Sequence, residues 1–294
     1  MGRAAALGLA LLLWAAWIRP AQAWGALGHE AIALVAESLL QPDVRRRVDA
    51  ILAADTDPLT AHDIASAATW ADTYRQADMD GSRTRKWHYV DIALDAPSLD
   101  AACFRHVPLP PGTLASLGPA NSCVVDKIAQ FAAELADPDT QPDEQVLALK
   151  FLLHFVGDVH QPLHAADDDD RGGNEKRVFA PGLRAGNLHH FWDTEAVRLL
   201  GSNPRQIARS LLSQVPPAQM RSWARGTARD WALESFAIAR DQAYGQLPPP
   251  SRRGNYELTG RYIDMAARDA RLQLARAGVR LAFVLNRTLG RPRG

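Results

Sequence analysis

The sequence is short of several features that mark particular protein classes. Its 33 lysine and arginine residues are matched by 33 aspartate and glutamate residues, which excludes the broad basic face that duplex DNA binding requires. Beyond residue 18 no apolar run is long enough to cross a bilayer, so we expect no stable membrane association. Alternating strand patterns are scarce, and the two cysteines allow one intramolecular disulfide at most.

The first 23 residues have the pattern of a signal peptide. A basic start ending in Arg3 precedes an apolar run over residues 4–18, and AQA at 21–23 is the small-residue pattern after which signal peptidase cuts. The run is shorter than the roughly 20 residues of a membrane span, although an uncleaved anchor is the alternative. Cleavage predicts an exported protein, periplasmic or secreted, that begins at Trp24. Without Arg3 and Arg19 it has 31 basic and 33 acidic residues, a net charge of −2, so attraction for nucleic acid must be local.

Apolar residues recur at helical spacing over most of the remaining sequence. The segments that predict helices are 29–40, 43–53, 124–136, 144–160, 187–200, 204–215, 225–244 and 260–289. Breakers rich in proline, glycine and aspartate separate them, such as DMDGSR, DPDTQPD and QLPPPSRRGN. No internal repeat or long linker is present, so residues 24–294 are predicted to form one all-α, multi-helix domain, which we expect to be a monomer.

The two cysteines flank a proline-rich segment. In an oxidising compartment Cys103 and Cys123 can form a disulfide that closes the loop HVPLPPGTLASLGPANSC. Spacing alone leaves two free thiols as the alternative.

The candidate chemistry comes from histidine and aspartate residues. His154 and Asp158 stand four apart in LLHFVGDVHQPLH, so a helix presents both on one face. His164 follows in the turn beyond that helix, and His189 and Asp193 repeat the four-residue spacing in NLHHFWDTE. Imidazole nitrogen and carboxylate oxygen are ligands that zinc favours. One such pair is weak evidence, whereas two pairs with a histidine between them predict a metal centre.

Three further segments supply candidate ligands. Asp72 lies on a predicted helix in ATWADTYR, and His88 lies among aromatic and β-branched residues in KWHYVDI. His29 stands five residues after Trp24, where cleavage creates an α-amine with a pKa of about 8 that can lose its proton and bind metal. Taken singly, Asp72 fits a helix-surface carboxylate and His88 a buried polar residue.

Taken in order, these motifs resemble a known family. WGALGHE, WAD, WHYVD, HFVGDVHQPLH, GGN and NLHHFWD resemble the trinuclear-zinc nucleases of fungi, plants and bacteria, known as the nuclease S-one/P-one family. The resemblance runs from Trp24 to about Glu195, and WALES and RLAFVLN extend it. It implies the almost wholly helical fold shared with zinc-dependent phospholipase C, and an exported phosphodiesterase that cuts single-stranded DNA or RNA and also takes 3′-nucleotides.

Carried over position by position, the resemblance implies three zinc ions. The ligands of the first would be Asp72, His88, His154 and Asp158. The ligands of the second would be His164, His189 and Asp193. The third would take the amine and carbonyl of Trp24, with His29 and the other oxygen of Asp158. Three dipositive ions and three carboxylates leave the cluster at about +3, which supplies the local attraction for phosphate.

The resemblance also implies roles around the metals. Zinc-activated water would attack phosphorus and leave a 5′-phosphate product, with Asp72 and Asp158 catalytic through the metals they hold. Arg75 would face the scissile phosphate. Tyr89 would stack on a base, and Asp91 and Asn174 would contact its edge. Without the family, Arg75 fits a solvated helix charge, Tyr89 core packing and Asn174 a turn.

Two rival functions and one local feature stay open at this point. A phospholipase C shares the fold, but its longer gap after the N-terminal Trp and its Glu at the last ligand position differ from the gap of five and Asp193 here. A non-catalytic zinc-binding protein needs neither Arg75 nor a base pocket. The acidic run Asp167 to Asp170 fits a solvated loop, or a device that disfavours long polyanions. His160 and His190 are candidates for supporting contacts to the metal ligands.

Overall fold

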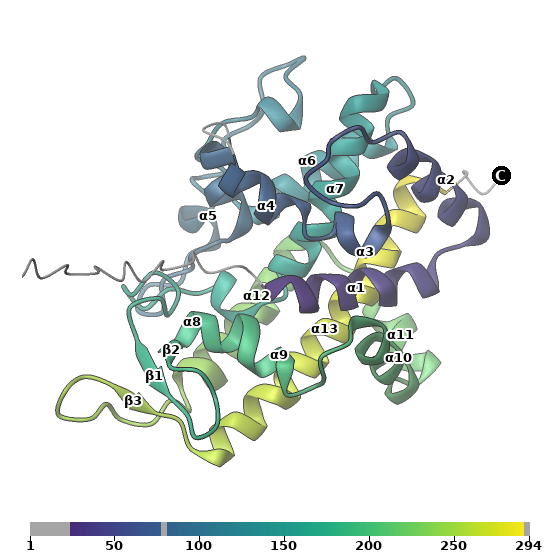
Figure 1. Ribbon diagram of the computed structural model, residues 1–294. Helices are drawn as coiled ribbons and strands as arrows, with labels where there is room; N and C mark the ends of the chain where they lie inside the picture. The colour runs from purple at the N-terminus through teal and green to yellow at the C-terminus, as the bar shows by residue number, and fades with distance from the viewer. Residues whose placement is uncertain (1–23, 78–80, 291–294) are drawn as a thin grey trace, which may run out of the picture.

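The computed structural model describes residues 24–77 and 81–290, which are mostly helical (Figure 1). The predicted signal peptide lies outside the described residues. The α-helices are α1 (Gly25–Leu39), α2 (Pro42–Ala53), α3 (Ile64–Ala67), α4 (Trp70–Ala77), α5 (Leu99–Ala102), α6 (Val124–Ala136), α7 (Pro142–Asp158), α8 (Leu188–His190), α9 (Ala196–Arg198), α10 (Pro204–Gln214), α11 (Pro217–Trp223), α12 (Ala228–Ile238) and α13 (Gly260–Thr288). The remaining elements are the tighter or wider helical turns η1 (Gly81–His88), η2 (Ala115–Leu117), η3 (Pro162–His164), η4 (Phe191–Glu195) and η5 (Ala239–Tyr244), and the strands β1 (Arg177–Phe179), β2 (Gly186–Asn187) and β3 (Tyr256–Glu257).

Helix starts follow from residues that satisfy the first backbone N–H groups. Thr227 and Asp230 form a reciprocal capping box at α12, with each side chain accepting from the other residue's N–H. Asn203 caps α10 by accepting from the N–H of Gln206 at 3.1 Å. Helices α2, α7, α10 and α11 have proline in the first turn, where its missing N–H is not needed. The predicted all-α domain is therefore confirmed as a mostly helical fold.

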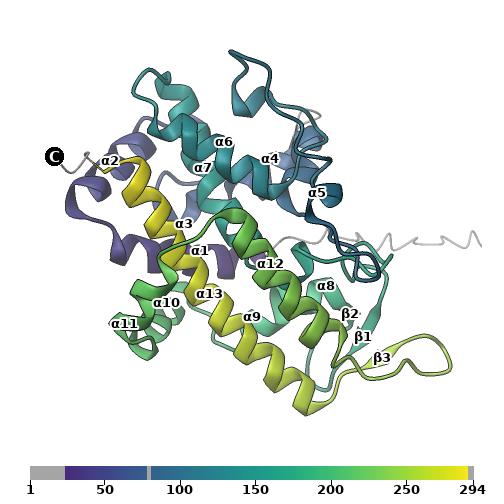
Figure 2. The same cartoon turned by 180° about the vertical axis from the view of Figure 1, so that it is seen from behind.

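The longest helix, α13, runs across the whole molecule and packs along α1 (Figures 1 and 2). The two backbones approach closely at Gly278, where a Cβ atom would lie only 2.4 Å from Cγ1 of Val35. A larger residue at this position would push the helices apart. Helices α6 and α7 form a second packed pair. No described helix is both long and apolar enough to span a membrane.

An aromatic cluster surrounds the middle of α7. Phe151 stacks on Phe131 of α6 with ring centroids 4.6 Å apart, and it meets Trp70 and Trp87 edge-on. All four side chains are nearly or fully buried. Because α4 and η1 carry these tryptophans, the cluster holds both elements against α7, the helix that carries His154 and Asp158.

A small three-stranded sheet departs from the helical prediction. Strand β1 is central and pairs antiparallel with β2 and parallel with β3. The loop that leads into β3 projects to the left in Figure 1. These strands are two or three residues long, too short to show an alternating pattern in the sequence. The prediction also missed α11, which has only seven residues and buries no side chain fully.

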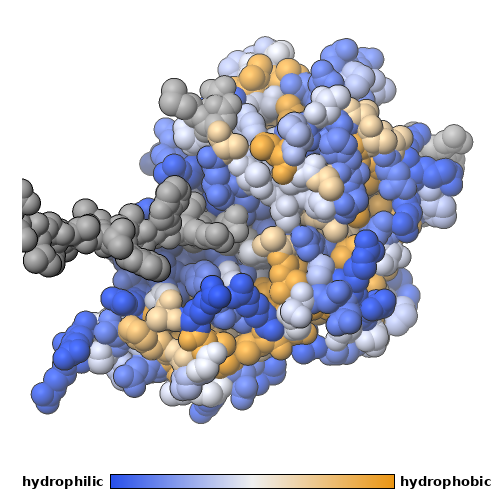
Figure 3. Space-filling view, viewed as in Figure 1, coloured by the Kyte–Doolittle hydropathy of each residue, from blue (hydrophilic) through white to orange (hydrophobic). Residues whose placement is uncertain are grey.

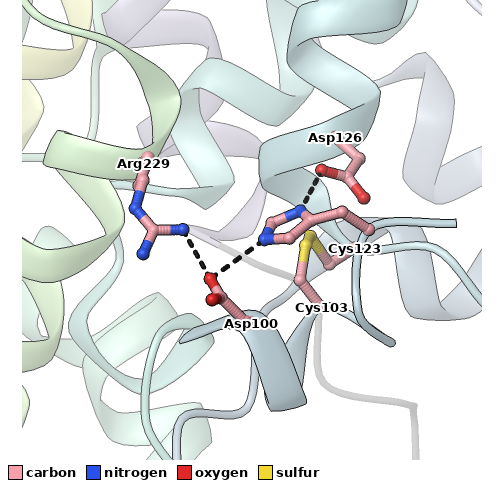
Figure 4. Close-up of a disulfide and its surroundings, with 6 residues drawn as sticks. Asp100, Cys103, Cys123, Asp126 and Arg229 are labelled. Atoms are coloured by element: carbon pink, nitrogen blue, oxygen red, sulfur yellow. Dashed lines mark hydrogen bonds and ion pairs between the residues drawn. A yellow bond between two sulfur atoms is a disulfide. The ribbon is translucent and has the colours of Figure 1, made fainter. Parts of the chain in front are cut away.

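The two cysteines form the predicted disulfide, so the free-thiol alternative is wrong (Figure 4). Beside it, His106 Nδ1 lies 2.7 Å from Asp126 of α6, and Nε2 lies 3.2 Å from Asp100 of α5. Asp100 also accepts from Arg229 of α12 at 2.7 Å. The disulfide and this chain of charged groups tie the proline-rich segment to three helices. The sulfur atoms bond each other and are not available to a metal.

Candidate metal centre

Seven separate elements contribute the eight candidate side chains. They are His29 on α1, Asp72 on α4, His88 at the end of η1, His154 and Asp158 on α7, His164 at the end of η3, His189 on α8 and Asp193 on η4. All eight are buried. Their ligand atoms form three groups, each with its members within 4.8 Å of one another: His29, His154 and Asp158; Asp72, His88 and His154; His164, His189 and Asp193. The residues singled out in the sequence therefore converge in space.

Asp158 lies at the centre of the first two groups. Its Oδ1 is 3.3 Å from Nε2 of His29, and its Oδ2 is 2.9 Å from Nδ1 of His88 and 3.3 Å from Nε2 of His154. The two oxygens of one carboxylate thus face different groups. This is the arrangement expected of a residue that bridges two ions.

The third group is built on a helix of unusual pitch. His189 and Asp193 are four residues apart, but Phe191–Glu195 form a π-helical turn in place of the continuous α-helix predicted over 187–200. Nε2 of His189 still lies 3.2 Å from Oδ2 of Asp193, and Nε2 of His164 lies 3.2 Å from Nε2 of His189. Single π-turns are frequent at functional sites because they redirect one side chain.

Hydrogen bonds set the protonation of three imidazoles. Nδ1 lies within hydrogen-bonding distance of a backbone carbonyl in His154 (Ala68, 2.7 Å), His164 (His88, 2.8 Å) and His189 (Gly172, 2.6 Å). A carbonyl oxygen can only accept, so each Nδ1 carries a proton and Nε2 is the ring nitrogen that faces the groups above. This is the tautomer and orientation that a metal ligand requires.

The unsatisfied atoms of the site indicate cations. Buried atoms without a hydrogen-bond partner include Nε2 of His29 and His154, Oδ1 of Asp158 and Oδ2 of Asp193. Leaving such groups unpaired costs about 1–3 kcal/mol each, so a fold that collects several in one place normally fills it. The adjoining Nε2 lone pairs of His164 and His189 also repel unless a positive charge lies between them. The chemistry of this donor set fits metal ions.

Local electrostatics favour the ligand form of His29, His88 and Asp158. Burial and the neighbouring His154 lower the pKa of His29, and burial and Arg75 lower the pKa of His88 to about 4. Burial alone would raise the pKa of Asp158, but the adjoining His154, followed by His29 and His88, brings it well below its usual range. Two imidazoles are thus neutral and the central carboxylate is charged at pH 7.

Trp24 lies fully buried beside the centre of the site. Its indole Nε1 donates to the carbonyl of Gly157 at 3.0 Å, directly before Asp158. Two glycines permit this approach: a Cβ on Gly28 would lie 2.8 Å from Cβ of Trp24, and one on Gly157 would lie 2.8 Å from Nδ1 of His29. The start of α1 is therefore packed against the end of α7, where the third ligand set was expected.

Arg75 reaches the same site from α4. Its Nη2 lies 2.7 Å from Oδ1 of Asp72, and only 10% of its side chain is exposed, so a solvated surface charge does not describe it. Helix α4 itself is tied to α7, because Trp70 Nε1 donates to Asp57, and Lys150 of α7 is within 3.4 Å of the same carboxylate. These contacts hold Asp72 and Arg75 in place.

The candidate base contacts lie beside the third group. Val90 donates to the carbonyl of His164 at 2.8 Å, which places the neighbouring half-buried Tyr89 and Asp91 along the metal-ligand segment. Burial and Asp167 raise the pKa of Asp91 to about 7. Asn174 directly follows Gly173, whose carbonyl accepts from the N–H of His189 at 3.3 Å. The structure therefore gathers all three residues around one edge of the centre.

Two contacting residues were missed in the sequence. Gln161 is fully buried, and its amide donates to Oδ1 of Asp193 while its carbonyl oxygen accepts from Leu163. Asn187 caps α8 and donates to Oδ1 of Asn174 at 3.2 Å. His160, by contrast, bonds Val156 and Arg280. His190 Nε2 lies 3.7 Å from Glu195. The available signal in the sequence was position: Gln161 directly precedes the turn that carries His164, and Asn187 directly precedes the helix that carries His189.

The acidic run is only partly exposed: Asp168 and Asp169 are exposed, Asp167 is half-buried and Asp170 is buried. Asp170 is buried and accepts from Gly173 and Tyr244, and its other oxygen is 3.0 Å from Nζ of Lys176. Asp168 pairs with the same lysine, and Asp167 accepts from the backbone of Asp170 and Gly172. Three of the four carboxylates thus make contacts around the GGN loop, so the predicted solvated loop is solvated only in part.

Comparison with known proteins agrees with this site. The S1/P1 nuclease family model matches residues 24–290. Nuclease P1 of Penicillium citrinum is 29% identical to the chain, over 91% of this chain and 98% of its own length. Nuclease S1 of Aspergillus oryzae is 27% identical, over 92% and 93%, and Endonuclease 2 of Arabidopsis thaliana is 26% identical, over 91% of each chain.

Proposed function

The chain belongs to the S1/P1 nuclease family and is a phosphodiester-cleaving hydrolase, and on that premise we propose that it uses three zinc ions to cut single-stranded DNA or RNA. The observation that carries the proposal is the convergence of eight buried histidine and aspartate side chains with orphaned donor atoms in three adjoining groups. Products carry a 5′-phosphate, and 3′-nucleotides are further substrates. The relatives' names support nuclease chemistry over the phospholipase C and storage alternatives.

The ligand assignment combines the three groups with the family resemblance. The first ion takes Asp72, His88, His154 and Asp158. The second takes His164, His189 and Asp193. The third takes His29, Asp158 and the α-amine and carbonyl that Trp24 offers once residues 1–23 are removed, which also implies export. When bound, zinc supplies a Lewis acid and lowers the pKa of water to about 7.

The protein's own residues position the substrate. Arg75 holds an oxygen of the scissile phosphate, since a guanidinium fork matches phosphate as well as the carboxylate it meets in Asp72. Tyr89 offers its ring to an unstacked base, which single strands supply and duplexes do not. Asp91 and Asn174 contact the edge of that base. Gln161 holds Asp193 in orientation through its amide.

The proposal is tested with zinc-loaded protein that begins at Trp24. Single-stranded DNA, single-stranded RNA, duplex DNA, 3′-AMP and phosphatidylcholine are incubated in parallel, and the phosphate position of each product is determined. We expect cleavage of both single strands with 5′-phosphate ends, slow cleavage of the duplex, and no release from the lipid. Hydrolysis of phosphatidylcholine alone, or inertness toward every phosphate ester, would refute the proposal.

A further inference from the structure

The small sheet is covalently continuous with the candidate site. Strand β2 ends at Asn187, the cap of the helix that carries His189, and β1 begins three residues after Asn174. Strand β3 joins β1 at the far edge, with Val178 paired to Tyr256 and Phe179 to Glu257. We call residues 175–187 and 245–258 the arginine sheet, because they carry the charge described next.

The arginine sheet is basic in a chain of zero net charge. It contains Glu175 and Glu257 against five basic residues: Lys176, Arg177, Arg184, Arg252 and Arg253. Lys176 is paired with Asp168 and Asp170, but the four arginines are exposed. Across the described parts of the chain, no carboxylate forms an ion pair with any of these four. With Lys176 paired, the four exposed arginines and the two glutamates leave a local charge of +2, and the guanidinium of Arg177 lies 5.4 Å from the centre of the Phe179 ring.

Two of the arginines stand at the tip of the projecting loop. The turn is held by bonds from Ser251 N–H to the carbonyl of Asn255 at 2.7 Å and from Gly254 N–H to the carbonyl of Ser251 at 2.9 Å. Gly254 takes the left-handed conformation (φ 76°) that such a turn needs. In Figure 3 this loop appears as a hydrophilic arm that stands clear of the body.

The strand register relates the tip to the site. Because β1 and β3 are parallel and pair at Val178–Tyr256 and Phe179–Glu257, the start of β3 lies beside the start of β1, three residues after Asn174. Arg253 lies three residues before Tyr256, within about 10 Å of the sheet at roughly 3.3 Å per residue. Figure 1 places the loop on the same side as α8 and opposite α2. Within the neighbouring acidic run, Asp168 and Asp170 pair with Lys176, so the charge available to a ligand is that of the four arginines.

We propose that the arginine sheet binds the phosphates of a single strand beyond the nucleotides held at the metal centre. This inference rests on the proposed function and adds a preference for long strands over mononucleotides and dinucleotides. The charge favours a polyanion, and continuity of β1 and β2 with Asn174 and His189 favours the strand already bound there. An exposed arginine that contacts a phosphate contributes to affinity by releasing counterions. Each such contact makes the plot of log affinity against log salt concentration steeper by about 0.7.

The test compares two arginine pairs in zinc-loaded protein. Arg252→Ala/Arg253→Ala removes the tip, and the matched control Arg45→Ala/Arg46→Ala removes an adjacent pair on α2, at the opposite end of the molecule. KM and kcat are measured on a single-stranded 30-mer and on a dinucleotide at about 50 and 200 mM NaCl. We expect the tip variant to raise KM for the 30-mer about fivefold or more at the lower salt, with the dinucleotide and the control unchanged.

The salt dependence adds a second readout. Two phosphate contacts account for a factor of about seven in affinity across this fourfold salt range, so the difference in KM between wild type and tip variant should nearly vanish at the higher salt. An unchanged KM for the 30-mer, or an equal loss on both substrates, would overturn the inference while leaving the proposed function intact. Wild-type protein that cleaves neither substrate would overturn both. Reduced binding to phosphatidylglycerol vesicles with an unchanged KM would identify an anionic membrane as the ligand instead.

Discussion

Asn187 offers a sharp test of how the base contact and the metal ligands are connected. Its side-chain oxygen accepts from the N–H of His190 at 2.7 Å and so caps the helix that carries His189. Its amide donates to Oδ1 of Asn174 at 3.2 Å, and the amide of Asn174 donates in turn to the carbonyl of Arg171 at 2.8 Å. One residue therefore supports a ligand helix and orients a candidate base contact.

Serine separates the two roles. Asn187→Ser keeps an oxygen that caps a helix about as well as asparagine does, but it has no amide to hold Asn174. The loss of one hydrogen bond is worth about 0.5–1.5 kcal/mol, or roughly two- to twelvefold in affinity. The proposed contact of Asn174 with the base would be the same in the ground and transition states, so KM should rise by that factor with kcat nearly constant.

The assay measures kcat and KM on dinucleotides that differ in one base, together with zinc content per chain. Asn203→Ser is the matched control, since Asn203 caps α10 in the same way. Asn187→Ala should also lose the cap, lower stability by about 1 kcal/mol and weaken zinc binding. The reasoning fails if Asn187→Ser leaves KM and base preference unchanged, or if it lowers zinc content as much as Asn187→Ala does.

Three further predictions follow from buried charges and the start of the chain. Asp158→Asn should lower turnover by about a thousandfold, or roughly 4 kcal/mol of barrier, and should also lower zinc content. Asp91→Asn should lower turnover by less than about tenfold. Equal turnover of Asp158→Asn and wild type would rule out a bridging carboxylate. A Gly-Ser extension before Trp24 should leave helicity unchanged, remove about one zinc ion and slow turnover at least tenfold, which is about 1.4 kcal/mol of barrier. If the extended protein is fully active, and N-terminal sequencing confirms that the extension is present, the amine of Trp24 is not a ligand. Hydrogen bonds to Asp126 and Asp100 raise the pKa of His106, so its added stability is present below about pH 6.5 and is lost as pH rises through the higher folded pKa. Wild type should therefore exceed His106→Gln in urea midpoint more at about pH 5 than at about pH 9, with both proteins in EDTA, and a pH-independent difference would contradict this.

The sequence by itself was enough for the helical architecture and for the eight histidine and aspartate residues that converge in the structure. Apolar residues that recur with a period of 3.6 over a long segment, as in α13, favour a helix over other secondary structures. The helix then buries the apolar stripe that these residues form. The spacing of His154 and Asp158 places them on one helix face whatever surrounds that helix. The ligand residue types at these spacings carried the family resemblance because zinc accepts few donor atoms.

The tertiary structure alone decided which of these residues meet and what holds them. Asp158 touches His29 and His88, which lie 129 and 70 positions away along the chain, through the packing of α1 and η1 on α7. Strands of two or three residues form because β1 lies between two partners, a pairing that no local pattern encodes. Asp170 turns inward to accept a hydrogen bond from Tyr244, which is distant in the chain. Asn187 has its double role because the backbone brings it close to Asn174. Local periodicity specifies a helix, but contacts between helices arise from side-chain shape and buried hydrogen bonds, which appear only once the chain has closed on itself.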